Sequence, residues 1–221
     1  MAISFRDRRE AGRLLASKLS NYAGRSDVVV LGLPRGGVPV AFEVAKILKV
    51  PLDVFVVRKL GVPGHEELAM GATATGNVRV LNKDVIKTLA IPDEVIESVA
   101  TGEERELARR ERQYRENRTP VEVDGKTVIL VDDGLATGSM MHAAVLALRS
   151  RNPAHLVVAV PVAASETCED FKNEVDEIVC ATTPEPFYAV GQWYKEFSQT
   201  SDKEVRELLS RAAQNEAVSG P

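Results

Sequence analysis

The segment VILVDDGLATGSM, residues 128–140, decides the fold of this chain of 221 residues. Its first residues form a short continuous apolar run, which is typical of a strand buried on both faces of a sheet. Two acids and a loop of small residues follow, and a helix is expected from about Ser139 to Arg149. A strand, a loop and a helix in this order indicate an α/β fold.

Two adjacent acids, Asp132 and Asp133, stand where the expected strand ends. In open α/β sheets, ligands collect at the carboxyl ends of the strands. Two carboxylates repel a phosphate, but they can accept hydrogen bonds from neighbouring hydroxyls or face a hydrated metal ion. The pair therefore predicts a ligand with a free diol.

The loop after the acids suits an anion. Its small residues let the backbone approach a ligand closely, and the N–H groups at the helix start favour negative charge. Thr137 and Ser139 add hydroxyl donors. Together with the acids, this loop predicts a sugar phosphate; an ordinary strand–helix turn with a capping Asp is the alternative. The small residues are Gly134, Ala136 and Gly138.

The rest of the chain fits a parallel sheet. The pattern of apolar runs and breaks predicts β-loop-α-β in the first third, and two further buried strands near the C-terminal end. The expected strands are Val28 to Leu33, Leu52 to Val57, Thr127 to Val131, His155 to Val160 and Glu177 to Cys180; the expected helices begin near Ser4 and Val38, with a short one from Ser165 to Lys172.

Three segments are expected to lie outside this sheet. Residues 58–70 carry two glycines and a proline, which favours an irregular, mobile loop. Residues 70–75 and 78–81 predict a hairpin that turns at Gly76-Asn77. From Pro92 to about Arg118 the chain predicts a long charged helix, with Gly102 as a candidate break.

Arginines on the two charged helices are expected to face solvent. In the first helix they lie opposite the leucines, and in the long helix interleaved glutamates predict ion pairs on a solvated face. The first set is Arg6, Arg8, Arg9 and Arg13; the second is Arg105, Arg109, Arg110, Arg112 and Arg115.

Composition excludes several classes. The net charge of −4 argues against a general nucleic-acid binder. The start of the chain has no apolar signal core, and the apolar runs are too short for a membrane-spanning helix. Cys168 and Cys180 lack metal-site spacing, so we expect reduced thiols in a cytoplasmic protein. His65, His142 and His155 are scattered, which excludes a zinc site built from them.

The segment VILVDDGLATGSM resembles the phosphoribosyl-pyrophosphate (PRPP) motif of type I phosphoribosyltransferases. The resemblance implies that Asp132 and Asp133 contact the ribose 2′ and 3′ hydroxyls, and that residues 136–140 wrap the 5-phosphate. Two positions depart from the usual pattern. Gly134 replaces an aliphatic residue or Ser, and Met140 stands where Thr or Ser is common, which removes one phosphate donor.

A second loop, in LGLPRGG (residues 31–37), resembles the pyrophosphate loop of this family. Backbone amides and a guanidinium would there meet the leaving group, a role that suits Arg35. Taken alone, this loop would be interpreted as a turn with an exposed arginine. Because it occurs together with the ribose motif, it predicts a pyrophosphate-binding site. The loop residues implied in PRPP binding are Pro34, Arg35, Gly36 and Gly37.

Arg58 and Lys59 follow the second strand, as in the segment before the catalytic loop of the family. Lys59 would offset charge on departing pyrophosphate; a solvated basic pair is the alternative. The stretch VVRKLGVPGHEELAMGA is similar to a subgroup of uncharacterised bacterial phosphoribosyltransferases, and this similarity extends from FRDRREAG to PEPFYAVGQWYKEF.

An aromatic tail follows the last expected strand. In the family a variable hood binds the nucleobase, which gives Phe187, Tyr188 and Trp193 a candidate stacking role. A small satellite core or a dimer contact is the alternative for most of the tail's aromatics. The others are Tyr194 and Phe197.

The resemblance implies a type I phosphoribosyltransferase fold: about five parallel strands in the order 3-2-1-4-5, helices on both faces and a small hood. Residues 1–180 would form the core, with the N-terminal helix as a candidate part of the hood, and residues 181–221 the hood and tail. The implied reaction transfers 5-phosphoribose from PRPP to a nitrogen acceptor, in first place a nucleobase, and releases pyrophosphate. Asp132 and Asp133 would hold Mg²⁺ through water.

The remaining expectations concern partners and alternatives. We expect a homodimer without membrane or nucleic-acid partners. A PRPP- or nucleotide-sensing regulator without turnover is the main alternative function, and a PRPP or nucleotide hydrolase is a third. The sequence does not identify the acceptor.

Overall fold

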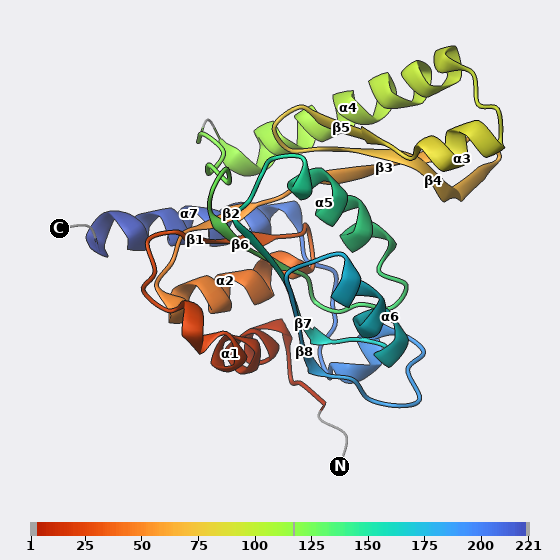
Figure 1. Cartoon of the computed structure of the whole chain (residues 1–221). Coiled ribbons are helices and arrows are strands. Elements are labelled where there is room, and N and C mark those ends of the chain that lie inside the picture. Colours follow the sequence, from red (N-terminus) through yellow and green to blue (C-terminus); the bar gives the residue numbers. More distant parts are fainter. Residues whose placement is uncertain (1–3, 117, 220–221) are drawn as a thin grey trace.

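The computed structural model describes residues 4–116 and 118–219. A five-stranded parallel sheet forms its centre (Figure 1). The predicted fold class is confirmed. In space the strands follow the order β2-β1-β6-β7-β8; they are β1 (Val28–Gly32), β2 (Leu52–Val54), β6 (Thr127–Val131), β7 (His155–Val162) and β8 (Glu177–Thr182).

The strand order differs from the expected one. Counted along the chain, the five sheet strands lie in the order 2-1-3-4-5 rather than 3-2-1-4-5. The difference arises after β2, because the next strand, β3 (Val57–Val62), leaves this sheet and pairs antiparallel with β4 (His65–Ala74). β2 is therefore an edge strand of the central sheet.

Helices cover both faces of the sheet, as predicted. Alternate residues of β1 and β6 enter two separate cores: Val28, Val30, Ile129 and Val131 pack on one face, and Val29, Leu31, Val128 and Leu130 on the other. This alternation follows from the pleat of a strand. The helices of the first face are α1 (Arg8–Lys18), α2 (Gly37–Leu48) and α7 (Asp202–Ser219); those of the second are α5 (Ser139–Arg149), α6 (Ser165–Asp170) and the 3-10 turn η2 (Phe171–Asn173).

An arm projects from this body (Figure 1). It contains a second sheet, in the order β3-β4-β5, and the helices that flank it. Its carboxyl-terminal helix runs back to the body, where Leu107 and Tyr114 join the main core. The remaining arm elements are β5 (Val78–Leu81), α3 (Lys83–Thr88) and α4 (Asp93–Arg115).

The prediction of an irregular loop over residues 58–70 is wrong, because most of it forms the β3–β4 hairpin. The glycines and the proline that suggested a loop occupy special positions instead. Pro63 and Gly64, with φ +80° at the glycine, make the turn, and Gly61 sits at a register shift against the Glu66 backbone. The predicted hairpin that turns at Gly76-Asn77 is confirmed, with positive φ at both residues.

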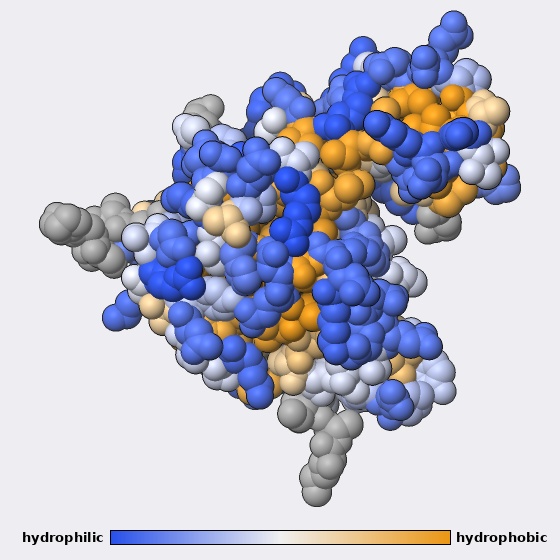
Figure 2. Space-filling model, viewed as in Figure 1, coloured by the Kyte–Doolittle hydropathy of each residue, from blue (hydrophilic) through white to orange (hydrophobic). Residues whose placement is uncertain are grey.

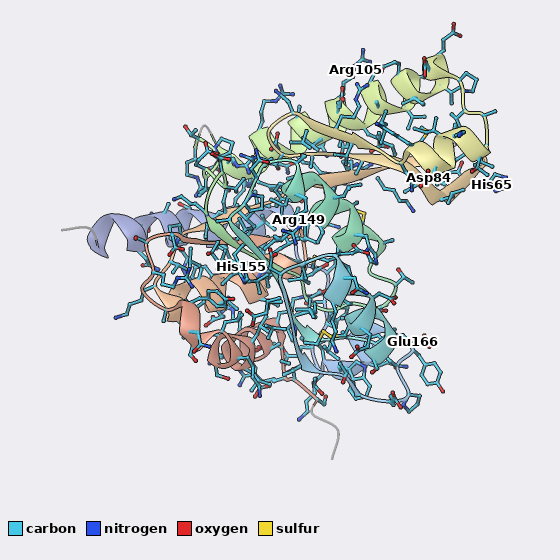
Figure 3. The ribbon with its side chains drawn as sticks, viewed as in Figure 1. His65, Asp84, Arg105, Arg149, His155 and Glu166 are labelled. Carbon is cyan, nitrogen blue, oxygen red and sulfur yellow. A yellow bond between two sulfur atoms is a disulfide. The ribbon has the colours of Figure 1, made fainter. Side chains whose placement is uncertain are left out.

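The long charged helix is continuous. α4 spans 23 residues without a break at Gly102, since one glycine costs a helix only about 1 kcal/mol. Much of its surface is solvated, and Arg105 points outward in Figure 3. The prediction is wrong for Arg115, whose buried guanidinium donates to both carboxylate oxygens of Asp53 at 3.2 Å and to Val54 O at 2.7 Å.

The N-terminal segment joins the aromatic tail. Asp7, rather than Ser4, caps α1, and its Oδ1 accepts from Glu10 N at 2.8 Å. Phe5 pairs with the tail through two backbone hydrogen bonds of 2.8 Å, to Trp193 O and from Lys195 N. By contrast, α7 packs into the main core through Val205, Leu208, Leu209 and Ala212. The division into a core and a hood stays a prediction.

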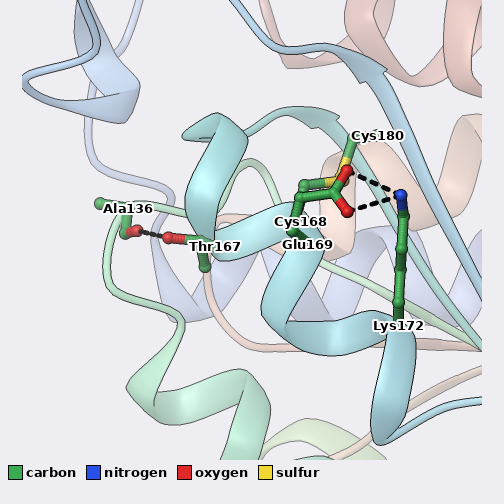
Figure 4. The surroundings of a disulfide bond; sticks show 6 residues. All are labelled: Ala136, Thr167, Cys168, Glu169, Lys172 and Cys180. Carbon is green, nitrogen blue, oxygen red and sulfur yellow. Dashed lines mark hydrogen bonds and ion pairs between the residues drawn. A yellow bond between two sulfur atoms is a disulfide. The ribbon is translucent and has the colours of Figure 1, made fainter.

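The expectation of two reduced thiols is wrong: Cys168 and Cys180 form a disulfide (Figure 4). Strand β8 brings Cys180 beside α6, so that the two Cα atoms lie 6.6 Å apart. A spacing of 12 residues carries no such signal in the sequence.

Two further expectations concern metals and membranes. Within residues 4–116 and 118–219, no group of three or more metal-ligating side chains comes together. Figure 3 shows His65 on the arm and His155 in the body, and His142 pairs with Glu174 at 2.8 Å. In the same described part of the chain, no helix is long and apolar enough to cross a membrane.

Candidate active site

The two predicted ligand loops lie side by side. β1 and β6 are neighbours, with Gly32 opposite Val131, so the chain leaves both strands at the same edge of the sheet. The contact between the loops is close enough to require glycine. A Cβ built on Gly37 would lie 2.6 Å from Val131 O, and one on Gly36 would lie 2.1 Å from Oδ2 of Asp133. The structure thus brings together Pro34 to Gly37 and the two acids.

The loop of residues 134–138 presents backbone donors. Gly138 has φ +69° and precedes α5 without a side-chain cap. Among the described residues, none accepts a hydrogen bond from the N–H groups of residues 136–140. Ala136, Thr137 and Ser139 are exposed. These N–H groups at a helix start can bind an anion such as phosphate.

α6 supports this loop from behind. Thr167 Oγ1 donates to Ala136 O at 2.5 Å (Figure 4). A Cβ on Gly138 would lie 2.9 Å from the Phe171 ring and 3.0 Å from Thr167 Cγ2, so the loop has no room to move toward the helix. Cys168, next to Thr167, ties α6 to β8 through the disulfide.

The side chains of Asp132 and Asp133 lie in a poorly solvated environment. Burial raises the pKa of Asp132 well above its usual value, and the negative charge of Asp133 raises it further. Burial also raises the pKa of Asp133, although Arg8 opposes the change. Asp132 Oδ1 accepts from Asp133 N at 2.8 Å, which fixes one carboxylate against the other's backbone. Two such groups are costly to ionise without a ligand.

The structure adds Arg8 and Tyr194, which the sequence interpretation did not select. Arg8 Nε donates to Asp133 Oδ2 at 2.8 Å, and the Tyr194 hydroxyl donates to Asp133 O at 2.6 Å. Burial and the nearby acids raise the pKa of Tyr194, so its hydroxyl stays a donor. The expectation that Arg8 faces solvent is wrong, since its side chain is mostly buried on Asp133. The sequence did not indicate this contact because the two residues are 125 positions apart.

The structure explains why glycine stands at position 134. A Cβ at this position would lie 2.6 Å from Val190 Cγ1 and 3.0 Å from Val162 O. Val190 belongs to the 3-10 turn η3 (Val190–Trp193) of the aromatic tail. An aliphatic residue or Ser at position 134 would collide with this turn, so the tail and the departure from the usual motif go together.

The three basic residues singled out in the sequence lie in different parts of the molecule. Arg35 is half-buried, and its Nη1 lies 3.8 Å from Oδ1 of Asp202 at the start of α7. Arg58 pairs with Glu103 on α4 at 2.5 Å. Lys59 lies in strand β3 opposite Ala72, rather than in a loop. Of the three, Arg35 stands next to the paired loops.

Comparison of the sequence with models of known protein families identifies the family of this chain. The model of the phosphoribosyl transferase domain matches residues 7–190, a range that holds both loops and both acids. The chain belongs to the phosphoribosyl transferase family. The predicted family is thereby confirmed.

Curated relatives match almost the whole of this phosphoribosyl transferase domain. Two curated proteins of Mycobacterium tuberculosis, "Putative phosphoribosyl transferase MT0597" and "Putative phosphoribosyl transferase Rv0571c", are each 47% identical over 216 residues. The match covers 98% of this chain and 48% of each relative, so the chain spans about half their length.

Solved structures extend the comparison. The protein TT1426 of Thermus thermophilus is 42% identical, with a TM-score of 0.86 over 95% of this chain and 99% of that one. The AQ2163 protein of Aquifex aeolicus is 13% identical, with a TM-score of 0.50 over 83% of this chain and 78% of that one, and shares the fold.

The aromatic residues of this phosphoribosyl transferase domain mostly contact one another. Phe187 stacks on Trp193 with ring centroids 6.2 Å apart, and Tyr194 contacts Phe5 at 5.5 Å and Phe197 at 5.0 Å. Tyr188 is 76% exposed. These contacts form the satellite core that was the alternative interpretation of the tail. A stacking role for Phe187, Tyr188 or Trp193 stays a prediction.

A cavity of about 250 Å³ lies on the other side of Arg8. It opens between the start of α1, Pro39 of α2 and the tail, and its walls are mainly polar. Arg8 lines this cavity and also bonds Asp133. Residues that line it include Arg9, Glu196, Ser198, Thr200 and Glu204.

Proposed function

We propose that this domain transfers the 5-phosphoribosyl group of PRPP to a nitrogen acceptor. One observation carries the proposal: a loop with free backbone N–H groups and a pair of adjacent carboxylates meet a second glycine loop at one sheet edge. Such a site offers separate places for a phosphate, a diol and a second anion. PRPP is a ligand with all three groups.

The proposed roles follow from the chemistry of each group. Residues 136–139 hold the 5-phosphate, Asp132 and Asp133 accept from the ribose hydroxyls, and residues 34–37 hold the pyrophosphate. The C1–O bond breaks and its electron pair leaves with pyrophosphate, the acceptor nitrogen bonds to C1, and the proton that the nitrogen loses passes to water. Arg35 and Lys59 stabilise the departing charge. Gly134 leaves room for Val190 of the tail beside the proposed ribose site.

Magnesium fits this donor set only together with the substrate. The two carboxylates are adjacent, but no third acidic or histidine ligand joins them among the described residues. Mg²⁺ commonly uses one or two carboxylates, waters and substrate phosphates. Asp132 and Asp133 would hold it, in part through water, and the bound ion would offset the charge of the pyrophosphate.

The cavity beside Arg8 is the proposed acceptor site. Arg8 lines it and also binds the carboxylate that would bind ribose, which supports an acceptor on this side of the ribose. Its volume suits a small molecule, and its polar walls suit one that forms several hydrogen bonds. A nucleobase is the first candidate. Phe187, Tyr188 and Trp193, the predicted stacking partners, are not among the residues that line this cavity, so they would contact the base only from outside it.

The proposal includes a homodimer. Large apolar side chains are exposed on the arm, and Figure 2 shows hydrophobic atoms there and where the arm meets the body. A second copy would remove them from water. Sedimentation equilibrium should give twice the chain mass. The arm leucines concerned are Leu68, Leu81 and Leu89.

Pyrophosphate release tests the proposed function. Wild type, PRPP and Mg²⁺ should be assayed with a panel of purines, pyrimidines and other amines. Release that needs one acceptor supports transfer, release without any acceptor indicates a hydrolase, and PRPP binding without release indicates a sensor.

A matched binding experiment tests the site. The double variant with Asp132→Asn and Asp133→Asn should lose measurable PRPP binding by calorimetry while its circular dichroism spectrum is kept. Asp84→Asn, an exposed residue on the arm (Figure 3), is the control and should bind as wild type does. Unchanged affinity in the double variant would refute the proposed ribose site.

A further inference from the structure

Arg8 connects three parts of the molecule. Its Nε donates to Asp133 Oδ2 at 2.8 Å, its Nη1 donates to Ser198 O at 2.7 Å, and its guanidinium lies 4.0 Å from the centroid of the Phe197 ring. The side chain is only 12% exposed. It stands between the proposed ribose carboxylate and the tail segment that lines the cavity.

The Asp133 carboxylate is held on several sides. Arg8 binds Oδ2, Gly36 leaves no space beside the same oxygen, and the Tyr194 hydroxyl fixes the backbone carbonyl. Within the described residues, no group donates to Asp133 Oδ1. One oxygen is thus engaged, and the other is left to accept from a ligand.

We propose that Arg8 is a positioning residue for ribose: by holding Oδ2 of Asp133, it presents Oδ1 to a ribose hydroxyl. This inference rests on the proposed function and deepens it. Arg8 would act on the sugar through Asp133, since in the described part of the chain its hydrogen bonds go to Asp133 and Ser198 and not to residues 136–139. It also ties ribose recognition to the tail, since the same guanidinium holds Ser198 and Phe197.

The role predicts a selective effect on two ligands. Inorganic phosphate would bind the anion loops without using Asp133, whereas ribose 5-phosphate also uses Asp133. Arg8→Met keeps most of the length of the side chain and removes its donors. It should lower the affinity for ribose 5-phosphate by about tenfold, as expected for the loss of one oriented charge-assisted hydrogen bond. The affinity for inorganic phosphate should stay unchanged. Both affinities are measured by calorimetry.

Two further variants sharpen the test. Arg8→Lys keeps the charge but lacks the fork that binds Asp133 and Ser198 together, so it should recover part of the lost affinity. Arg13→Met is the matched control, because Arg13 is an exposed arginine of the same helix whose Nε bonds only to Arg9 O. It should change neither affinity.

The outcomes are distinct. A loss of affinity for ribose 5-phosphate alone in Arg8→Met supports the inference. Equal losses of affinity for ribose 5-phosphate and phosphate, or no loss for either ligand, overturn it. If Arg8→Met does not fold by circular dichroism, Arg8→Lys decides in the same way, with a selective loss of about threefold as the supporting result. A wild type that binds ribose 5-phosphate no better than phosphate would instead refute the proposed ribose site itself.

Discussion

Gly36 lies directly against the carboxylate of Asp133: a Cβ at position 36 would be 2.1 Å from Oδ2. The backbone of Gly36 is helical, with φ −63° and ψ −34°, so alanine is compatible with its conformation. What glycine provides here is space. The loop of residues 34–37 and the carboxylate of Asp133 can adjoin only because this side chain is missing.

Gly36→Ala should therefore displace Asp133 and weaken PRPP binding at least tenfold, with little backbone strain. Calorimetry measures the affinity. Gly102→Ala is the control, because a Cβ there meets nothing within 4 Å. That helical site should gain about 0.5–1 kcal/mol of stability without a change in affinity. Normal PRPP affinity in Gly36→Ala would show that Asp133 does not act as proposed.

Asp132→Asn should stabilise the protein at neutral pH without ligand or Mg²⁺. The pKa of Asp132 is raised in the folded chain by burial and by Asp133. The folded state then binds the proton more tightly than the unfolded state, so the free energy of unfolding falls as pH rises from about 4 through the raised pKa. Asparagine removes this loss and can still accept from Asp133 N.

Thermal denaturation of wild type and Asp132→Asn between pH 4 and pH 8 measures the effect. The variant's midpoint should exceed that of wild type at the upper end, and the two curves should converge toward acid. A lower midpoint for the variant at pH 8 would contradict the burial cost assigned to Asp132.

Arg35→Ala and Lys59→Ala should lower kcat more than PRPP affinity. A group that offsets charge on departing pyrophosphate acts more strongly in the transition state than in the bound state. An oriented cation of this kind is worth about 3 kcal/mol, or about a hundredfold in rate. Pyrophosphate release gives kcat, and calorimetry gives the affinity.

Lys87→Ala, an exposed lysine of α3, is the control for the loss of one charge. It should leave both quantities unchanged. Full kcat in Arg35→Ala and Lys59→Ala would remove these residues from the proposed reaction but keep the enzyme. Weaker PRPP binding without any release by wild type would favour the sensor.

Reduction of the Cys168–Cys180 disulfide should lower the thermal midpoint. A cross-link between residues 12 apart contributes about 3 kcal/mol in the loop-entropy description, which is roughly 6–12 °C for a chain of this size. Differential scanning calorimetry with and without a phosphine reductant measures the shift. The double variant Cys168→Ser, Cys180→Ser should be insensitive to the reductant. An unchanged wild-type midpoint after complete reduction would disagree with this prediction.

The sequence predicted the central strands, and the positions of the two loops that follow β1 and β6, well. The apolar run before Asp132 and the small residues before Ser139 are local signals, and the structure has β6 over Thr127–Val131 and α5 over Ser139–Arg149. The β3–β4 hairpin was missed, because its glycines and proline mark a turn and a register shift rather than a loop.

By itself the sequence determined the α/β class, the two loops and the acids at the sheet edge, since hydrophobic period and turn residues act within a few positions. Only the tertiary structure decided that Arg8 holds Asp133, that Arg115 is buried on Asp53, and that the cysteines pair. Each of these contacts joins residues whose nearness depends on which strands and helices pack together. That choice is made by burying both faces of the whole sheet, which no local pattern records.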